Sequence, residues 1–367
     1  MDFAEVLREH WPRYVEQASG PIPSRAWAAV EAVLSCRTAR RGGHLHHCAG
    51  CRRYHYIYHS CNHRACPRCG AAEQEQWARR QEAQLLPVPY YLLTLTVPAE
   101  MRGVFLHYPV EIIPVFFAAL VSSLKALCSR RKFLGGEIGF TAVLHTWTRR
   151  MLFHPHIHVL VPAVGLIQSG CALRLPCNEG YLLPEKALAH ATREAMKETL
   201  TRDYPEIFAR IESAAWQKPW VAQAQWAGRG RTALRYLAAY VKKSALSEGR
   251  LIGYDQNGHI VLNYRDSADG KRKSQALDPL ELIQRWLLHV LPKGLVRVRH
   301  YGWLSPAAHK AFLRVRFLLG LGPYRLPPLR KSEPPRCPFC NGVLAQIARI
   351  APQRGPPLSR AILKAAA

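Results

Sequence analysis

Acidic residues are scarce in this sequence. Its 367 residues include 25 Asp and Glu against 51 Lys and Arg, which gives a formal charge of +26 with histidine neutral. A soluble chain with this imbalance usually has a polyanionic partner, and nucleic acid is the first expectation. An anionic membrane surface and a basic surface without a partner are the alternatives. The shortage of carboxylates also disfavours an active site built on an acidic triad.

Long apolar runs are missing as well. The longest, residues 112–124, contains Pro114 and is bounded by Glu111 and Lys125. It is shorter than the roughly 20 apolar residues that span a bilayer, so we expect a buried helix and no membrane partner. The N-terminus lacks the basic segment and apolar run of a signal peptide. These absences predict a cytoplasmic protein.

Two further features are absent. There is no internal repeat, and there is no Gly-x4-Gly-Lys-Ser/Thr loop, which would bind nucleotide phosphates. Any helicase that the protein needs would therefore be a separate host protein.

Cysteine and histidine, in contrast, are abundant, with 11 and 17 residues. An odd cysteine count and short spacings favour metal ligation over disulfides in a reducing compartment. Cys48-x2-Cys51 and Cys66-x2-Cys69 are separated by 14 residues, a spacing that predicts one tetrahedral zinc site. Four thiolates leave no open position, so this zinc would be structural, and the arginines around it would contact DNA phosphates.

Other cysteines could add to the zinc sites. Cys36 and Cys61 could hold a second zinc with two histidines of the same window. That window offers His44, His46, His47, His55, His59 and His63. Cys337-x2-Cys340 is a single knuckle with no cysteine or histidine after it. It is either half of a site completed by upstream ligands or a vestige.

The order of predicted elements favours an α+β fold with an antiparallel sheet, because strands and helices do not alternate regularly. Strands are expected over 90–97, 140–147, 156–161, 259–264 and 295–300, and helices over 71–86, 105–128, 184–203, 232–247 and 279–291. Three domains are predicted: a zinc-binding DNA-binding domain over 1–86, a catalytic domain over 87–305, and a basic, Pro-rich arm over 306–367, which we expect to fray after Cys337 and Cys340.

His156-Ile157-His158 lies in one of these strands. Residues two apart on a strand share a face, so His156 and His158 would form half of a divalent-metal site. His154 is in phase but precedes Pro155, and His145 would lie opposite His156 if strands 140–147 and 156–161 form a hairpin. Either could be the third ligand. A pair of hydrogen-bonded core histidines is the alternative.

Tyr236 and Tyr240 are four residues apart in a predicted helix and would share one of its faces. Tyrosine is a weak nucleophile unaided because its pKa is near 10. A metal that polarises a phosphate would supply the missing activation. Two amphipathic core tyrosines are the alternative.

His156-Ile157-His158 followed by Tyr236-x3-Tyr240 resembles the HUH nucleases, and most closely the two-tyrosine transposases of rolling-circle insertion sequences. The resemblance extends in order along the chain. It includes Cys36-Arg37-Thr38, Cys66-Pro67-x-Cys69, Leu144-His145-Thr146-Trp147, Tyr264-Arg265-Asp266, Leu288-His289-Val290 and Arg299-His300-Tyr301-Gly302. It implies a zinc-ribbon-like module followed by an HUH nuclease domain, which has a central antiparallel sheet and flanking helices.

The resemblance also implies an activity. The family nicks single-stranded DNA at the ends of its element, one tyrosine becoming linked to the 5′ phosphate, and the second tyrosine allows strand transfer. By motif, His156 and His158 would bind Mg²⁺ or Mn²⁺, and Tyr236 and Tyr240 would be the nucleophiles. No acidic or Gln residue near the histidines is an obvious third ligand, which departs from the family pattern.

The resemblance further implies partners: single-stranded element-end DNA, a host helicase and the replication machinery. We expect association with the bacterial nucleoid. Two other functions remain open. A replication initiator or relaxase shares the histidine pair and the tyrosine chemistry. A zinc-ribbon regulator without catalysis would explain the cysteines and the charge, but not the ordered histidines and tyrosines.

Overall fold

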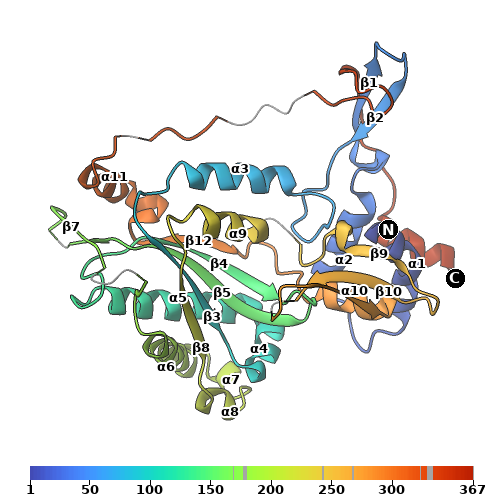
Figure 1. Cartoon of the computed structure of the whole chain (residues 1–367). Helices are drawn as coiled ribbons and strands as arrows, with labels where there is room; N and C mark the ends of the chain where they lie inside the picture. The colour runs from blue at the N-terminus through green and yellow to red at the C-terminus, as the bar shows by residue number, and fades with distance from the viewer. Residues whose placement is uncertain are drawn as a thin grey trace.

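The computed structural model describes residues 1–167, 169–176, 180–241, 244–266, 268–322, 324–328 and 334–366, without the side chains of 236, 239–241 and 364–366 (Figure 1). The fold is α+β, as predicted, and is built around one five-stranded sheet. Its strand order is β12-β4-β5-β3-β8, and every neighbouring pair is antiparallel. The strands are β3 (Tyr90–Thr96), β4 (Phe140–Trp147), β5 (Phe153–Pro162), β8 (Val221–Trp226) and β12 (Val298–Tyr301).

Alternation along these strands gives the sheet two different faces. One face carries Leu93, Leu144 and Ile157 and is covered by helices on the side of α5 and α6 (Figure 1). The elements around this core are η2 (Ala99–Met101), α4 (Arg102–His107), α5 (Pro109–Cys128), α6 (Glu185–Asp203), α7 (Pro205–Phe208) and α8 (Ala214–Gln217). A short ribbon, β6 (Gly165–Leu166) with β7 (Leu173–Arg174), extends from β5.

Helix α5 contains the longest apolar run. It is 20 residues long, so by length and composition alone it could cross a membrane. The expectation that the run is too short therefore does not hold for the helix, which extends beyond the run at both ends. Its residues Ile112, Phe116, Phe117 and Leu120 are fully or almost fully buried against the sheet. The prediction of a buried core helix is confirmed.

The opposite face of the sheet is covered by helices α3 (Ala71–Glu82), α9 (Arg231–Val241) and α11 (His309–Leu318). Val143 of β4 and Leu160 of β5 share a core there with Leu234 and Leu237 of α9. Figure 1 shows α3 and α9 side by side above the sheet, opposite α5 and α6. The turns η4 (Gly302–Leu304) and η5 (Pro306–Ala308) lead from β12 into α11.

A second core joins segments that are far apart in the sequence. Phe3 and Trp11 of α1 (Phe3–Glu16) pack with Ile260, Ile283 and Trp286. This core also includes parts of α2 (Ser24–Ser35), the sheet β9 (Leu251–Tyr254), β10 (Ile260–Arg265) and β11 (Arg272–Leu277), helix α10 (Pro279–Leu287) and helix α12 (Leu358–Ala366). The turn η3 (Glu248–Arg250) leads into β9. We call the structural unit built around this core the N-terminal module. Its segments are therefore discontinuous in sequence.

The C-terminal residues do not fray throughout. Strand β13 (Leu344–Ile350) pairs with β1 (Gly43–Cys48), which pairs in turn with β2 (Tyr54–Tyr58), giving a three-stranded sheet β13-β1-β2. A turn, η1 (Ala39–Arg41), precedes β1. Helix α12 then packs on α1 and α2. The expectation that the chain frays after Cys340 is wrong for the described residues 341–366, because β13 pairs with a strand some 300 residues earlier in the chain and α12 packs on the N-terminal helices.

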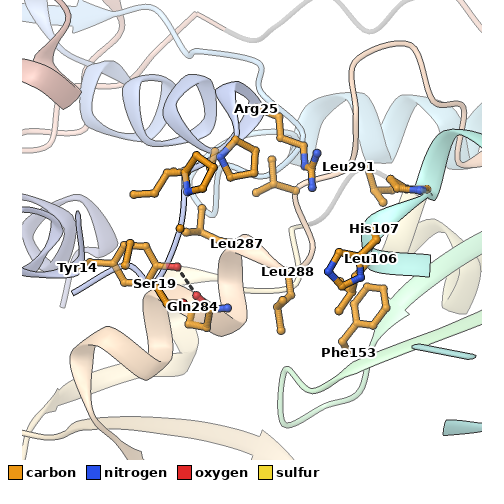
Figure 2. A pocket seen from close by; sticks show the side chains of 18 of the residues that line it. Tyr14, Ser19, Arg25, Leu106, His107, Phe153, Gln284, Leu287, Leu288 and Leu291 are labelled. Carbon is orange, nitrogen blue, oxygen red and sulfur yellow. Dashed lines mark hydrogen bonds between the residues drawn. The ribbon is translucent and has the colours of Figure 1, made fainter. Parts of the chain in front are cut away.

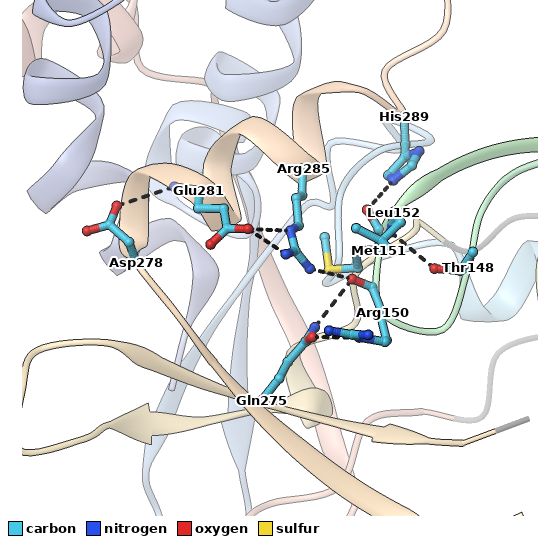
Figure 3. A network of polar contacts seen from close by, with 9 residues as sticks. All are labelled: Thr148, Arg150, Met151, Leu152, Gln275, Asp278, Glu281, Arg285 and His289. Carbon is cyan, nitrogen blue, oxygen red and sulfur yellow. Dashed lines mark hydrogen bonds and ion pairs between the residues drawn. The ribbon is translucent and has the colours of Figure 1, made fainter. Parts of the chain in front are cut away.

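A polar network connects the N-terminal module to the turn between β4 and β5 (Figure 3). Arg285 of α10 donates to the main-chain oxygen of Arg150 at 2.9 Å, and Gln275 of β11 contacts both the side chain and the main chain of the same residue. Met151 in this turn has a positive φ of 61° and is fully buried in the second core. The turn between β4 and β5 is therefore held in place by residues of the N-terminal module, which do not belong to the central sheet.

Candidate functional site

The β4–β5 hairpin brings three histidines together. His145 pairs with His156 across the two strands, as predicted, and His158 is two residues further along β5. Each offers a ring nitrogen, and these atoms all lie within 4.8 Å of one another. The three side chains are 2%, 9% and 6% exposed. They share the sheet face of Val143 and Leu160, which is also the face covered by α9.

Hydrogen bonds orient two of these rings. His156 Nδ1 donates to the main-chain oxygen of His154 at 2.8 Å, since a carbonyl oxygen can only accept. His158 Nδ1 is bonded to Thr94 Oγ1 at 2.8 Å. With Nδ1 engaged in both rings, Nε2 is the nitrogen that would ligate a cation. Metal-bound histidines are commonly oriented by such bonds on the other ring nitrogen.

Burial keeps the three imidazoles neutral. It lowers the pKa of His156 to about 4 and, together with the charge of His156, the pKa of His158 to about 3. Burial also holds the pKa of His145 well below its usual range, helped by His158, His156 and the buried Arg297. A neutral imidazole has the lone pair that a metal needs. The arrangement therefore fits a divalent cation, with coordination positions left for a substrate.

His154, the other candidate third ligand, lies outside the group. Arg102 Nη2 donates to its Nδ1 at 3.2 Å, because guanidinium has no acceptor. The Nδ1 lone pair is thus used, and a fixed positive charge stands beside the ring. The structure brings His145 to His156 and His158, and it does not bring His154 into that group.

The two tyrosines are placed by helix α9. Positions 236 and 240 are separated by about one turn of this helix, which packs over β4 and β5, the strands that carry the histidines. The side chains of Tyr236 and Tyr240 lie outside the described residues. The helix predicted over 232–247 corresponds to α9, which begins at Arg231. The described residues 244–247 are not helical, and Leu246 packs in the second core.

Three residues of this region were not singled out by their chemistry in the sequence. Thr94 orients His158 from β3. His289 is buried, and its ring joins Thr146 Oγ1 (3.2 Å) to the Met151 main-chain oxygen (3.1 Å). Arg297, 9% exposed, lies over Trp147. Of these three, Thr94 had a sequence signal, as one of two threonines in phase with Leu92 on an otherwise apolar strand.

The first cysteine cluster lies at the base of the β1–β2 hairpin. Cys36, Cys61, Cys66 and Cys69 place their sulfurs within 4.8 Å of one another, and Cys61 and Cys69 are 3.6 Å apart. Main-chain N–H groups of Cys61 and His63 donate to the sulfurs of Cys36 and Cys61. Hydrogen bonds from Cys61 and Cys66 lower the pKa of the Cys36 thiol. Such a donor set suits zinc.

The second cluster contains Cys48, Cys51, Cys337 and Cys340. The predicted pairing of Cys48 and Cys51 with Cys66 and Cys69 is therefore corrected. The pair His47 and Tyr54 lies at one end of the β1–β2 ladder, and the pair Gly43 and Tyr58 lies at the other end. A ladder of five pairs separates the Cys48–Cys51 turn from the Cys61–Cys69 loop, which at about 3.4 Å per residue places them roughly 14 Å apart. Within the described residues, neither cluster includes a histidine, although His55 Nε2 lies 3.3 Å from Cys337 Sγ.

A cavity of about 910 Å³ lies at the seam between α1, α2, α10 and the start of β5. In Figure 2, Tyr14 and Gln284, which hydrogen-bond to each other, lie across from His107 and Phe153. Phe153 belongs to the core on the α5 side of the sheet, so this cavity does not open onto the histidine face. Its lining is mostly apolar.

Comparisons with known proteins agree with this arrangement. Residues 6–97 match a family model described as "Transposase zinc-binding domain", and residues 139–311 match one described as "Putative transposase". The first range contains the Cys36 cluster, and the second contains the three histidines and helix α9.

Two relatives are similar over most of their length. One is "Putative transposase y4qJ" of Sinorhizobium fredii (strain NBRC 101917 / NGR234), 29% identical over 340 residues, or 87% of this chain and 84% of the relative. The other is "Transposase for insertion sequence element IS801" of Pseudomonas savastanoi pv. phaseolicola, 26% identical over 307 residues, or 80% and 73% of the two chains. No solved structure matches the chain. The chain therefore carries an N-terminal transposase zinc-binding domain followed by a transposase domain, and its substrate is DNA.

Proposed function

We propose that this transposase nicks single-stranded DNA at the ends of its element through a covalent 5′-phosphotyrosine intermediate and then transfers the strand. The observation that carries the proposal is the group of three neutral histidines on the sheet face covered by α9. This chemistry needs a nucleophile and a cation that polarises the phosphate. Helix α9 carries two tyrosine positions, and the strands beneath it carry three imidazoles that could bind the cation.

In the proposed reaction, the phenol oxygen of Tyr236 or Tyr240 forms a bond to the scissile phosphorus, and the bond from phosphorus to the 3′ oxygen breaks. The phenol loses its proton, and the released 3′ oxygen gains one. Because the phosphotyrosine bond keeps the energy of the phosphodiester, rejoining to another 3′ hydroxyl needs no nucleotide cofactor. The second tyrosine serves a second cleavage, as the family resemblance implies.

The chain's own residues divide the remaining tasks. His145, His156 and His158 would hold a divalent cation, Mn²⁺ or Mg²⁺, which would polarise the scissile phosphate. Thr94 orients His158, and the His154 main-chain oxygen orients His156. Cys36, Cys61, Cys66 and Cys69 would bind a structural zinc ion, since four thiolates leave no position for a substrate. Near the nucleoid, a host helicase would supply the single-stranded DNA, and the replication machinery would fill the gap that is left.

The test is a cleavage assay on single-stranded oligonucleotides that carry the element ends, with Mn²⁺ or Mg²⁺. A covalent protein–DNA adduct on a denaturing gel is the expected result. Tyr236→Phe and Tyr240→Phe should each reduce transposition to background, and the double variant should form no adduct while it retains DNA binding. Tyr181→Phe, at an exposed position on a different segment, is the matched control. Wild-type adduct yield in the double variant would refute the nucleophile assignment.

A further inference from the structure

We propose that Cys48, Cys51, Cys337 and Cys340 bind one Zn²⁺ ion, which fastens the C-terminal segment, defined here as residues 334–366, to the N-terminal module. This site is additional to the one formed by Cys36, Cys61, Cys66 and Cys69. Residues 337 and 340 lie beyond both of the ranges that match family models. The proposal does not depend on the tyrosine chemistry.

The spacing of the sulfurs favours a metal over disulfides. Cys48 Sγ and Cys340 Sγ are 3.4 Å apart, and Cys51 Sγ and Cys337 Sγ are 3.5 Å apart. A disulfide would hold its two sulfurs at about 2.05 Å. Four sulfurs at about 2.3 Å from one zinc ion lie about 3.8 Å from one another in a tetrahedron. The observed separations are close to the zinc value, and each joins one knuckle to the other.

The backbone around the sulfurs is arranged like a pair of zinc knuckles. Main-chain N–H groups of Cys51 and Gly50 are directed at the Cys48 sulfur, and those of Cys340 and Phe339 at the Cys337 sulfur. These donors stabilise thiolate charge, as zinc requires. A Cβ at Gly50 would lie 3.4 Å from Cys340 Sγ, and one at Gly342 would lie 3.4 Å from both Cys48 Sγ and Cys340 Sγ. Each knuckle thus has a glycine packed on sulfur.

Near Cys337 and Cys340, few apolar contacts hold the C-terminal segment in place. The local core consists of Cys48, Cys337 and Leu344, with Cys51 and Ile57 packed against it. Five of the seven residues of β13 are exposed. So small an apolar core does not stabilise a fold by itself, and structural metals commonly supply the missing free energy.

Fastening this end has consequences for the other contacts of the segment. The β13–β1 ladder runs from the pair Leu344 and Cys48 to the pair Ile350 and Gly43. Further along, Ser359 N–H donates to Glu31 Oε2 at 2.9 Å, and α12 covers part of α1 and α2. The ion would therefore hold the strand that leads this helix onto the N-terminal module.

The primary test counts zinc in the full-length protein by native mass spectrometry and elemental analysis. Wild type is expected to hold two zinc ions per chain. Cys337→Ser, Cys340→Ser and Cys48→Ser should each hold one, and the double variant Cys48→Ser/Cys340→Ser should also hold one, because both ligands belong to one site. Cys171→Ser, an exposed cysteine outside both clusters, should keep two. A single ion in wild type, or two ions in Cys337→Ser, would overturn the proposal.

A second measurement uses the wild-type protein and does not depend on any variant folding. Partial chelation is followed by thiol alkylation and peptide mapping. Cys48, Cys51, Cys337 and Cys340 should become labelled together as one zinc ion is lost, independently of Cys36, Cys61, Cys66 and Cys69. Labelling of Cys337 and Cys340 while Cys48 and Cys51 stay protected would overturn the proposal. Failure of the four to react after denaturation without reductant would do the same, since it would indicate disulfides.

Discussion

The histidine group and the two cysteine clusters are built on opposite principles. The histidines project from the middle of a sheet whose two faces are both packed, and their ligand atoms come from strands held by continuous ladders. The cysteines lie in turns at the two ends of a small sheet with exposed strands. In the first case the fold determines the site. In the second, a bound ion would determine the fold.

The histidine group and the cysteine clusters also differ in the number and the chemistry of their ligands. Three buried, neutral imidazoles leave room for phosphate oxygens in the coordination shell of a cation. Four thiols close a tetrahedron and leave no room for a substrate. Substitutions in the two kinds of site should therefore have separable effects: loss of chemistry without loss of folding in one, and loss of folding in the other.

The largest effect on chemistry is expected for His156→Ala. Removing one of three ligands should weaken cation binding and the polarisation of phosphate, which is worth several kcal/mol, or about 10³-fold in rate. Adduct formation on single-stranded oligonucleotides measures it. The zinc content and the thermal unfolding midpoint should stay close to those of wild type. Activity within tenfold of wild type would show that the trio does not hold the catalytic cation.

Cys66→Ser is the counterpart in the first cysteine cluster. Cys66 is buried within the N-terminal core, and loss of its zinc should remove several kcal/mol of folding free energy from that module. We expect a lower zinc content, a lower unfolding midpoint and poorer soluble yield, measured by elemental analysis and calorimetry. Cys128→Ala, a buried cysteine of the other core, controls for lost packing and should keep its zinc. An unchanged zinc stoichiometry in Cys66→Ser would contradict the ligand assignment.

The difference between the two kinds of site also explains why the sequence predicted the histidine group correctly and the cysteine pairing wrongly. The histidine group is local: β4 and β5 follow each other directly, so hairpin pairing and a two-residue period suffice to place His145 opposite His156. The cysteine pairing failed because Cys48 and Cys51 find their partners 286 or more residues away, and no local pattern encodes that contact. β8 was missed because, at the edge of the sheet, its inner face carries only the small residues Ala222 and Ala224, which give a weak alternation with Gln.

Thr94→Val tests how strongly the sheet orients its ligands. The substitution keeps the shape of the side chain and removes the oxygen that bonds His158 Nδ1. Loss of such an orienting contact usually costs about 10–100-fold in metal affinity or activity. The concentration of Mn²⁺ for half-maximal cleavage measures it. Thr96→Val, the other threonine on this face of β3, is the control. Equal metal dependence in the two variants would mean that Thr94 does not position His158.

The choice of cation should reflect the donor atoms. Mg²⁺ prefers oxygen ligands and gives up its waters reluctantly, whereas transition-metal ions bind imidazole readily. We expect half-maximal cleavage at a Mn²⁺ concentration about tenfold lower than for Mg²⁺. A titration of wild-type cleavage with each ion decides this. Equal or tighter dependence on Mg²⁺ would indicate that oxygen ligands outweigh the histidines.

The smallest effect is expected for His154→Ala, although His154 is in phase with His156 on the same strand. Its Nδ1 is occupied by Arg102, and it contributes to the site through its main-chain oxygen, which the substitution retains. Cleavage should therefore stay within about threefold of wild type, because a half-buried side chain that is not itself a ligand contributes little. His145→Ala is the matched comparison and should lose about as much activity as His156→Ala. If the two variants exchanged these outcomes, the third ligand would be His154, and the hairpin register would not be what selects the ligands.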